Sequence, residues 1–319
     1  TKRRGLQPPG FNNQDRIAIA AFLAHRAPRV RPRSYETYEF WLNRWLRWRD
    51  ANGYPVRLKF VSLAELQHYF RDMEAQGLKP ASRDSSWRII RALWTLLNRR
   101  KLLTPKQQTF FQEDGVARVT VPDDIQPIYT EATIQALLAA CDKQTDEECA
   151  ARNRAIIYLL WETGARAGEL GTLTDEHTDV QRRHGVIDGK GGVPRWLRWD
   201  DGSAAALQAY LAVRTGPVGG PLLRNMIDGG PITVEGIRNM LARAARRAGV
   251  KLNRQSPIHS FRRTFAQEAL EGGLADLELQ QLMGHRTIVS TMRYTRRAPQ
   301  RLDEVYKRMR ANRKKNQRE

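Results

Sequence analysis

The sequence is poor in cysteine and in long apolar runs. Only two cysteines, Cys141 and Cys149, occur in 319 residues, too few for the disulfide framework of a small secreted scaffold. This scarcity points to a reducing compartment, and we expect a cytoplasmic protein. No segment approaches the roughly eighteen uncharged apolar residues that a membrane span needs. The basic start, residues 1–5, has no apolar run behind it, so we expect neither a signal peptide nor a membrane partner.

Acidic residues are the second shortage. The chain has 34 Asp and Glu against 54 Lys and Arg, a formal net charge of +20. Residues 1–118 carry 23 basic and 10 acidic side chains, residues 119–293 carry 21 of each, and residues 294–319 carry 10 and 3. An excess of this size must be solvated or paired with an anionic partner, and among such partners nucleic acid is favoured over an acidic membrane surface. The length allows about two domains.

The N-terminal part is predicted to be helical. Residues 1–14 are rich in proline, glycine and asparagine and should form a flexible leader. Apolar spacing then predicts an all-helical domain over residues 15–118. Its four expected helices run from Asp15 to His25, from an N-cap at Ser34, from Leu63 to Ala75, and from Pro80 or Ala81.

Tryptophan and arginine alternate in this domain. Five of the eight tryptophans lie here, at positions 41, 45, 48, 87 and 94, and we expect them in the core. Arg44 and Arg47 fall between the first three and Arg49 follows them, with only Asp50 nearby. A solvated helix face usually mixes charges of both signs, so this pattern favours contact with nucleic acid.

The rest of the chain is predicted to mix helices with one hairpin. Residues 119–130 contain two prolines and should form a linker. Helical spacing returns over residues 131–300, interrupted between 180 and 200 by a pattern typical of a β-hairpin with a glycine-rich turn. After Ser203 the helical pattern is expected to last to the end, where residues 301–319 form a helix and basic tail. The predicted fold class is mainly α, with a helical N-terminal domain and a mixed α/β C-terminal domain carrying a small antiparallel β-sheet.

Four short stretches hold residues suited to phosphate chemistry. They contain Arg166 with Glu169, Lys190 between two glycines, His259 with Arg262, and His285 after Met283-Gly284, with Tyr294 nine residues further on. Each permits a structural interpretation by itself. Arg166 and Glu169 suit a helical ion pair, Lys190 a solvated turn, and Tyr294 a place in the core. No Walker loop is present, because the spacing of glycines before Lys190 is wrong for one.

Taken together and in this order, these residues resemble the tyrosine recombinase (phage integrase) family. The resemblance is strong over residues 130–300 and weak over 15–118, which resemble the helical core-binding domain of that family. The position of Lys190 in a hairpin turn is similar to that in Xer-type members. The sequence departs from the pattern of many relatives at positions outside the six central residues: Ala165, His177, Val193 and Trp196.

The resemblance implies a metal-free and ATP-free strand-transfer reaction. Tyr294 would be the nucleophile and would form a 3′-phosphotyrosyl link. Arg166 and Arg262 would clamp the non-bridging phosphate oxygens, and His285 would add a donor. His259 would accept the tyrosine proton or hold the phosphate, and Lys190 would protonate the departing 5′ oxygen. Glu169 is expected to support this set, and no cofactor is expected.

The implied partner is double-stranded DNA carrying a specific inverted-repeat site. Two basic lobes joined by a linker suggest a clamp around the duplex. The residues expected to contact DNA are Arg44, Arg47, Ser82, Arg83, Ser86 and Arg91 in the first domain, and Arg238, Asn239 and Arg243 in the second. In the family a C-terminal helix often docks on a neighbouring subunit. The apolar stripe Leu302, Val305, Tyr306 and Met309 therefore implies a homotetramer on two DNA sites, with packing on its own domain as the alternative.

The favoured function is site-specific DNA recombination by a simple Xer- or Cre-like enzyme without an arm-binding domain, encoded by a bacterium, plasmid, transposon or phage. A type IB topoisomerase or a telomere resolvase would use the same chemistry. A catalytically silent, sequence-specific DNA-binding protein is a third interpretation, from a different functional class. The target sequence and the preferred direction of recombination stay open.

Overall fold

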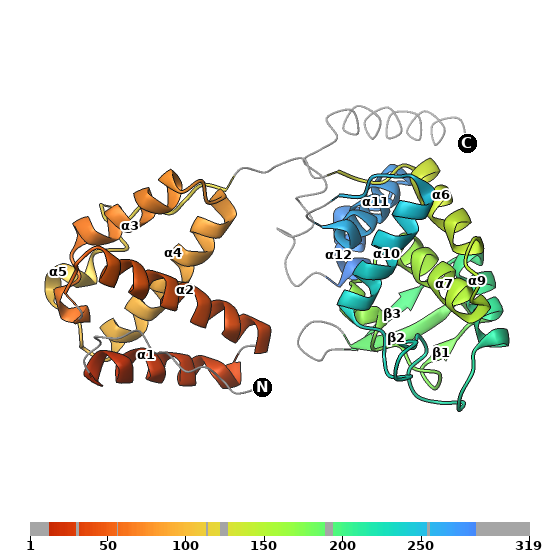
Figure 1. Ribbon diagram of the computed structural model, residues 1–319, viewed down its shortest axis with the longest axis horizontal. Coiled ribbons are helices and arrows are strands. Elements are labelled where there is room, and N and C mark those ends of the chain that lie inside the picture. The colour runs from red at the N-terminus through yellow and green to blue at the C-terminus, as the bar shows by residue number, and fades with distance from the viewer. Residues whose placement is uncertain are drawn as a thin grey trace, which may run out of the picture. The chain divides into compact units, whose positions relative to one another are not determined.

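The chain divides into two compact units, Thr1–Asp123 and Asp124–Glu319. The computed structural model describes residues 13–29, 32–55, 57–112, 114–121, 127–188, 194–253 and 256–284. Figure 1 colours the first unit red to yellow and the second yellow-green to blue. Each unit has its own cluster of buried apolar side chains. The predicted fold class, mainly helical with one small antiparallel sheet, is confirmed.

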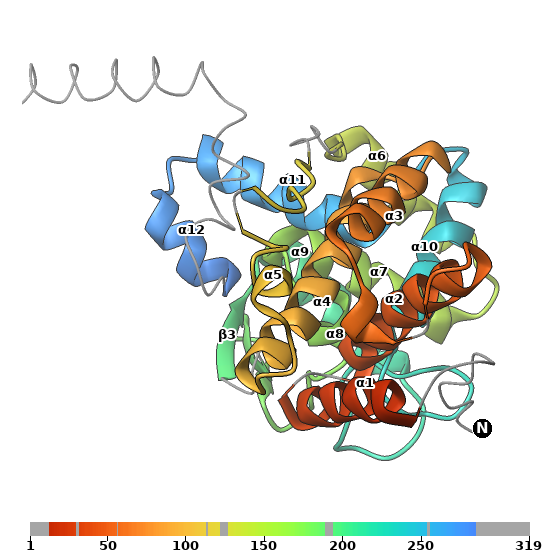
Figure 2. The ribbon, with the colours of Figure 1, turned by 90° about the vertical axis from the view of Figure 1, so that its left-hand side faces the viewer.

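All the described elements of the first unit are helices (Figures 1 and 2). Helix α4 packs against α1, α2 and α3. The predicted bounds of α3 and the predicted start of α4 are confirmed: the hydroxyl of Ser62 accepts from the backbone N–H of Glu65 at the start of α3, and Pro80 opens α4. The elements are α1 (Asn13–Arg26), η1 (Ala27–Arg29), α2 (Pro32–Ala51), η2 (Leu58–Phe60), α3 (Leu63–Ala75), α4 (Pro80–Arg99) and α5 (Pro105–Gln108).

The start of the second helix differs from the prediction. Helix α2 begins at Pro32, so Ser34 lies inside its first turn and is not its N-cap. Proline suits that first turn, because its missing N–H has no intrahelical partner there and its φ is already helical.

Tryptophan forms much of the core of this unit. Trp41, Trp45, Trp87 and Trp94 are buried and Trp48 is half-buried. The rings of Trp45 and Trp94 meet edge to face at a centroid distance of 6.2 Å. These buried aromatic side chains tie α2 to α4.

Arg49 belongs to this core and not to a nucleic-acid face. Its side chain and that of Glu65 are each 1% exposed, and its Nε donates to Glu65 Oε1 at 2.6 Å. Its guanidinium also lies over the ring of Trp45, 5.2 Å from the centroid. Burial raises the pKa of the Glu65 carboxyl even though Arg49 opposes that shift. The interpretation of Arg49 as part of a DNA-facing arginine row is therefore wrong.

The second unit is built around α7, which packs against α6, α9 and α11 (Figure 1). Side-chain caps open its helices: Thr130 accepts from Thr133 at α6, and Asp146 from Cys149 at α7. The elements are α6 (Glu131–Asp142), α7 (Glu147–Thr163), α8 (Ala167–Leu170), β1 (Thr178–Asp179), β2 (His184–Asp188), β3 (Pro194–Arg198), α9 (Asp201–Val213), α10 (Val234–Ala248), α11 (Pro257–Glu271) and α12 (Asp276–Met283).

The helical pattern does not continue unbroken after Ser203. Residues 214–233 contain no helix, because prolines and glycines recur through this stretch and break helical hydrogen bonding. Arg224, which is 6% exposed, holds the segment by donating to the carbonyls of Thr215 and Gly219. The expectation of continuous helix there is corrected.

The predicted hairpin is confirmed. Strands β1, β2 and β3 form an antiparallel sheet in that order, with Val186 opposite Trp196. Ile187 and Leu197 are buried, so this face of the sheet packs on the core. The turn at residues 189–193, with Lys190, lies outside the described residues. Among the helices that are described, none is long and apolar enough to cross a membrane.

Candidate active site

Arg166 is presented by a sharp break between two helices. Helix α7 ends at Gly164 in the left-handed conformation, with φ of 56°. A Cβ at this position would lie 2.5 Å from Cδ1 of Phe265, so only glycine fits. Two residues later, Arg166 precedes α8 with its side chain 32% exposed. The cation therefore reaches solvent from a rigid turn.

Glu169 is buried beneath Arg166 and holds it in place by an ion pair. The carboxylate of Glu169 is 6% exposed, and its Oε1 accepts from Arg166 Nη1 at 2.6 Å. Its Oε2 accepts from the backbone N–H of Arg166 at 2.9 Å. Burial alone would raise the pKa of Glu169, but the charge of Arg195 and hydrogen bonds from Arg166 and Arg195 outweigh it and hold this pKa below its ordinary value. Glu169 is thus a carboxylate at neutral pH.

Arg262 connects three separate parts of the unit. It lies in α11 and is 1% exposed. Its Nη1 donates to the carbonyl of Gly164 at 2.5 Å, and its Nη2 donates to the carbonyl of Met283 at 2.6 Å. The side chain thereby joins the turn before Arg166 to the last residue of α12.

His259 lies one turn before Arg262, at the start of α11. The residue is exposed at the surface, yet its pKa falls below the ordinary 6.5, first because its ring is partly desolvated and then because Arg263, Arg262 and Arg166 are positively charged. The charges of Arg166 and Arg262, the two arginines predicted to bind the phosphate, thus both lower the pKa of His259. The imidazole is set to be neutral near physiological pH.

Three of the six predicted catalytic residues, Lys190, His285 and Tyr294, lie outside the described residues. The predicted docking stripe Leu302, Val305, Tyr306 and Met309 does so too. Across the described part of the chain, no group of three or more His, Cys, Asp or Glu side chains is placed to hold a metal ion.

The residues predicted to contact DNA in the first unit differ in accessibility. Arg47 and Arg91 are exposed, and Ser82 is half-buried. Arg44 donates to Gln76 Oε1 at 2.6 Å, and Arg83 pairs with Glu74 at 2.6 Å with only 14% of its side chain exposed. Arg44 and Arg83 are therefore already partnered within the protein.

Ser86 contradicts its prediction as a DNA contact. It is fully buried, and its hydroxyl hydrogen bonds with that of Tyr69 at 3.3 Å. The side chain therefore lies between helices in the core of the first unit, where it cannot touch a base edge.

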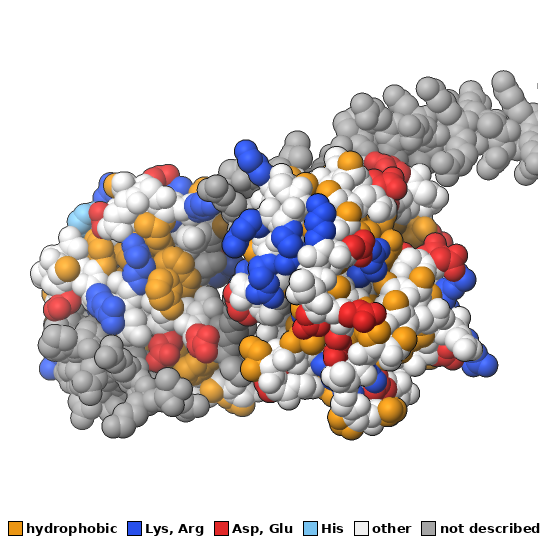
Figure 3. All heavy atoms as spheres, turned by 45° about the vertical axis from the view of Figure 1, so that its right-hand side comes forward, with side chains coloured by type: hydrophobic (Ala, Val, Ile, Leu, Met, Phe, Trp, Pro, Cys, Tyr) orange, Lys and Arg blue, Asp and Glu red, His pale blue; other side chains and the backbone are white. Residues whose placement is uncertain are grey.

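In the second unit, α10 has one apolar and one basic side. Ile237, Met240 and Leu241 are buried. Exposed positions carry the predicted Arg238, Asn239 and Arg243, followed by Arg246 and Arg247. Arg238 pairs with Glu235 in the first turn. Figure 3 shows lysine and arginine side chains gathered on a face of this unit. Such a surface suits phosphate contacts along a duplex.

Arg195 belongs to the cluster around Arg166 and Glu169, and its role there was not predicted from the sequence. It lies on β3, and its Nη2 donates to Glu169 Oε2 at 2.8 Å. The only sequence signal is strand alternation, which puts Arg195 on the same face as the buried Leu197. Its partners are remote in sequence, so spacing could not reveal them.

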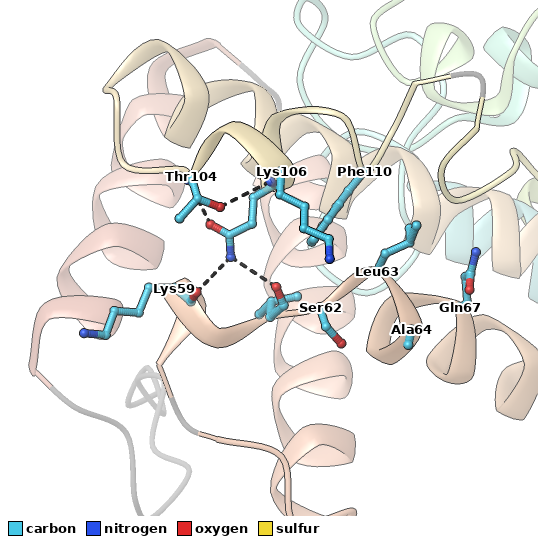
Figure 4. Close-up of a pocket in the computed structure, with 10 residues that line it drawn as sticks. Lys59, Ser62, Leu63, Ala64, Gln67, Thr104, Lys106 and Phe110 are labelled. Carbon is cyan, nitrogen blue, oxygen red and sulfur yellow. Dashed lines mark hydrogen bonds between the residues drawn. The ribbon is translucent and has the colours of Figure 1, made fainter.

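Two pockets lie apart from this cluster. One, of about 490 Å³, is in the first unit and is bordered by Lys59 and Lys106 (Figure 4). The buried Gln107 closes its floor by donating to the carbonyls of Lys59 and Val61. The other, of about 500 Å³, is lined by His177, His184 and Trp196 among others. Neither pocket contains Arg166, His259 or Arg262.

Comparison with known proteins identifies the family. The model of the phage integrase family matches residues 128–301. The tyrosine recombinase XerD of Vibrio cholerae serotype O1 is 30% identical over 270 residues, covering 83% of this chain and 86% of that protein. XerD of Mycobacterium leprae is 34% identical over 173 residues, 52% of this chain and 54% of that protein.

Solved structures share the fold. The XerH site-specific recombinase bound to a palindromic difH substrate, a post-cleavage complex, superposes with a TM-score of 0.70 at 17% identity and covers 94% of this chain and 90% of that one. A Tn1549 transposon integrase in complex with circular intermediate DNA gives 0.68 at 20% identity, over 87% and 93%. With the family match over more than half of the chain, these similarities establish that this protein is a member of the phage integrase family and a tyrosine recombinase.

Proposed function

We propose that this recombinase cuts and rejoins duplex DNA at a specific site through a phosphotyrosyl intermediate on Tyr294, acting as a tetramer on two sites. The observation that carries the proposal is the meeting of Arg166, His259 and Arg262. Arg166 is remote in sequence from the other two, yet Arg262 donates to the turn that presents Arg166, and the charges of both arginines lower the pKa of His259.

The chemistry follows from the residue types. The phenol oxygen of Tyr294 attacks the scissile phosphorus while its proton passes to the neutral His259. The bond between phosphorus and the 5′ oxygen breaks, and Lys190 protonates that oxygen. Rejoining reverses each transfer, with a 5′ hydroxyl as the attacking group. One phosphoester replaces another, so no nucleotide hydrolysis is needed.

The arginines stabilise the charge that builds on the phosphate. Arg166 is the more accessible of the two and offers its guanidinium to the non-bridging oxygens. Arg262 is buried and contributes permanent positive charge while it holds the surrounding backbone. His285 follows the last turn of α12 and adds a donor. Groups fixed in this way need little rearrangement during the reaction.

The basic surfaces of the two units bind the DNA duplex along its length. Exposed arginines on α10 and the excess of 13 positive charges over residues 1–118 favour phosphate contacts. The relatives named as tyrosine recombinases support recombination as the reaction. The apolar stripe Leu302, Val305, Tyr306 and Met309 would join neighbouring subunits.

The first prediction concerns Tyr294. The protein is mixed with a nicked random-duplex library, denatured with SDS, and DNA that stays attached to protein is recovered and sequenced. Attached DNA is expected with the wild type and should be abolished in Tyr294→Phe, because the ring without its hydroxyl has no nucleophile. Tyr158→Phe, which removes a hydroxyl elsewhere in the second unit, should trap as the wild type does.

The recovered sequences separate the candidate functions. One enriched motif with inverted arms supports a recombinase, and attachment without sequence preference would instead assign a topoisomerase. Specific binding without attachment would leave a DNA-binding role and overturn the mechanism. Attachment that persists in Tyr294→Phe would place the nucleophile elsewhere. Light scattering of the DNA complex, with Leu302→Asp as the disrupted form, tests the tetramer.

A further inference from the structure

Arg195 reaches the candidate active site from a strand. Along β3, Trp196 is 57% exposed and Arg198 is exposed, whereas the side chain of Arg195 is only 12% exposed. A long cation turned inward on a short strand has lost most of its water, and this costs free energy unless its donors find partners. Nη1 and Nη2 of Arg195 have such partners on two other elements, whereas its Nε has none among the described residues.

The two partners lie on α8 and α12. Nη2 of Arg195 donates to Glu169 Oε2 at 2.8 Å, and Nη1 donates to the carbonyl of Leu282 at 2.8 Å. Glu169 in turn holds Arg166. The carbonyl of Leu282 is one of those left without an intrahelical partner at the end of α12. One guanidinium therefore closes a link between three elements.

The chain leaves room for this link at Gly284. This residue ends α12 with φ of 62°, and a Cβ on it would lie 2.7 Å from Cδ and 3.0 Å from Nε of Arg195. Any other residue would therefore be strained and would press on the arginine. The absence of a side chain at Gly284 leaves the space that the Cδ and Nε atoms of Arg195 occupy.

Each of the three tied elements lies near a predicted catalytic residue in the sequence. Arg195 follows Lys190 by five positions, Glu169 follows Arg166 by three, and Leu282 precedes His285 by three. We infer that Arg195 is a positioning residue, which holds β3, α8 and the end of α12 at fixed spacing and so sets up strand cleavage by the catalytic residues next to them in the sequence. The inference rests on the proposed function for the roles of those three residues.

The planar, forked guanidinium group explains why an arginine suits position 195. Its nitrogens donate in two fixed directions at once, whereas a lysine ammonium on a flexible stem serves as a point charge. Lysine at position 195 should keep the attraction to Glu169 and lose the simultaneous contact with Leu282. Arg195→Lys is therefore expected to fall between the wild type and Arg195→Met.

The experiment compares Arg195→Met and Arg195→Lys with Arg198→Met, which removes an exposed arginine from the same strand. Single-turnover cleavage is measured on a nicked duplex that the wild type selects in the trapping experiment. Arg195→Met should cleave 10- to 100-fold more slowly, because misplacement by about 1 Å costs about 10²-fold. DNA affinity should stay within about twofold, since the phosphate-binding surface is intact, and Arg198→Met should match the wild type.

Hydrogen–deuterium exchange on the DNA-free full chain gives a readout that needs no activity. Arg195→Met should speed exchange in β2, β3 and the end of α12, and leave the first unit unchanged. Unchanged exchange at those segments, or wild-type cleavage by Arg195→Met, would overturn the inference. Equal losses of cleavage, DNA affinity and melting temperature would also overturn it, because Arg195 would then serve folding alone. If the wild type traps no DNA, the proposed function fails, and the exchange result still decides whether Arg195 ties the segments.

Discussion

His259 illustrates how single residues are tuned in this site. Its imidazole is flanked by cations, and its pKa lies below 6.5. An unfolded chain binds a proton at this histidine below about pH 6.5, whereas the folded chain resists it. The unfolded state thus holds more protons in the window between the two pKa values, and the stability of the second unit falls as the pH drops through that window.

The prediction is a melting temperature that declines for the second unit between pH 7.5 and 5.5, with a smaller decline in His259→Gln. His177→Gln, at an exposed histidine, should retain the wild-type decline. Calorimetry of the DNA-free protein measures the effect. A profile unaltered by His259→Gln would mean that the cations around the ring do not oppose its protonation.

Sequence spacing predicted contacts between residues that are close along the chain, but it did not predict contacts between residues that are remote. The pairing of Arg166 with Glu169 could be foreseen, because three positions separate them on the chain. Ser86 could not be assigned in this way, since its burial depends on Tyr69 from another helix. Arg49 finds Glu65 only after α2 and α3 pack, and Arg195 finds a carbonyl 87 positions away. Local patterns predict elements, whereas tertiary packing decides which polar side chain is buried.

At the scale of elements, the ends of helices position the site. Helix α7 must stop at Gly164 so that Arg166 turns outward and the carbonyl of Gly164 faces Arg262. Helix α10 ends in the same conformation at Gly249, with φ of 68°, but open space surrounds that residue. The two glycines share a backbone requirement and differ only in their surroundings.

Alanine at these positions separates the two costs. Gly249→Ala should lower the stability of the second unit by about 1–2 kcal/mol, the cost of the left-handed conformation. Gly164→Ala should lose about 1–3 kcal/mol more, because its Cβ meets the ring of Phe265. It should also impair DNA trapping. Chemical denaturation measures the difference, and equal losses would show that Phe265 moves aside freely.

At the scale of the whole molecule, each of the two units has a main core of its own among the described residues. Trp45 is fully buried in the first unit, and Leu160 is fully buried in the second. Cores that share no residues can unfold separately. The linker and the uneven charge of the sequence already indicated two domains.

Calorimetry of the full chain should therefore resolve two transitions. Trp45→Ala removes a large core side chain and should cost the first unit about 3–5 kcal/mol, leaving the other transition in place. Leu160→Ala should cost the second unit about 2–5 kcal/mol and produce the reverse pattern. Transitions that shift together in both variants would mean that the units unfold as one.

The carbonyls that Arg195 and Arg262 bind have a consequence for the anions that these two cations can hold. Leu282 and Met283 close α12, and Gly164 caps α7, so the electronegative ends of two helices sit against these cations. Part of the positive charge of the two arginines is thus neutralised by backbone carbonyls inside the protein. An isolated inorganic phosphate or a free nucleotide would compete poorly with those oxygens for the two guanidinium groups. A polynucleotide gains many contacts at once, so we expect it to bind where a single phosphate does not.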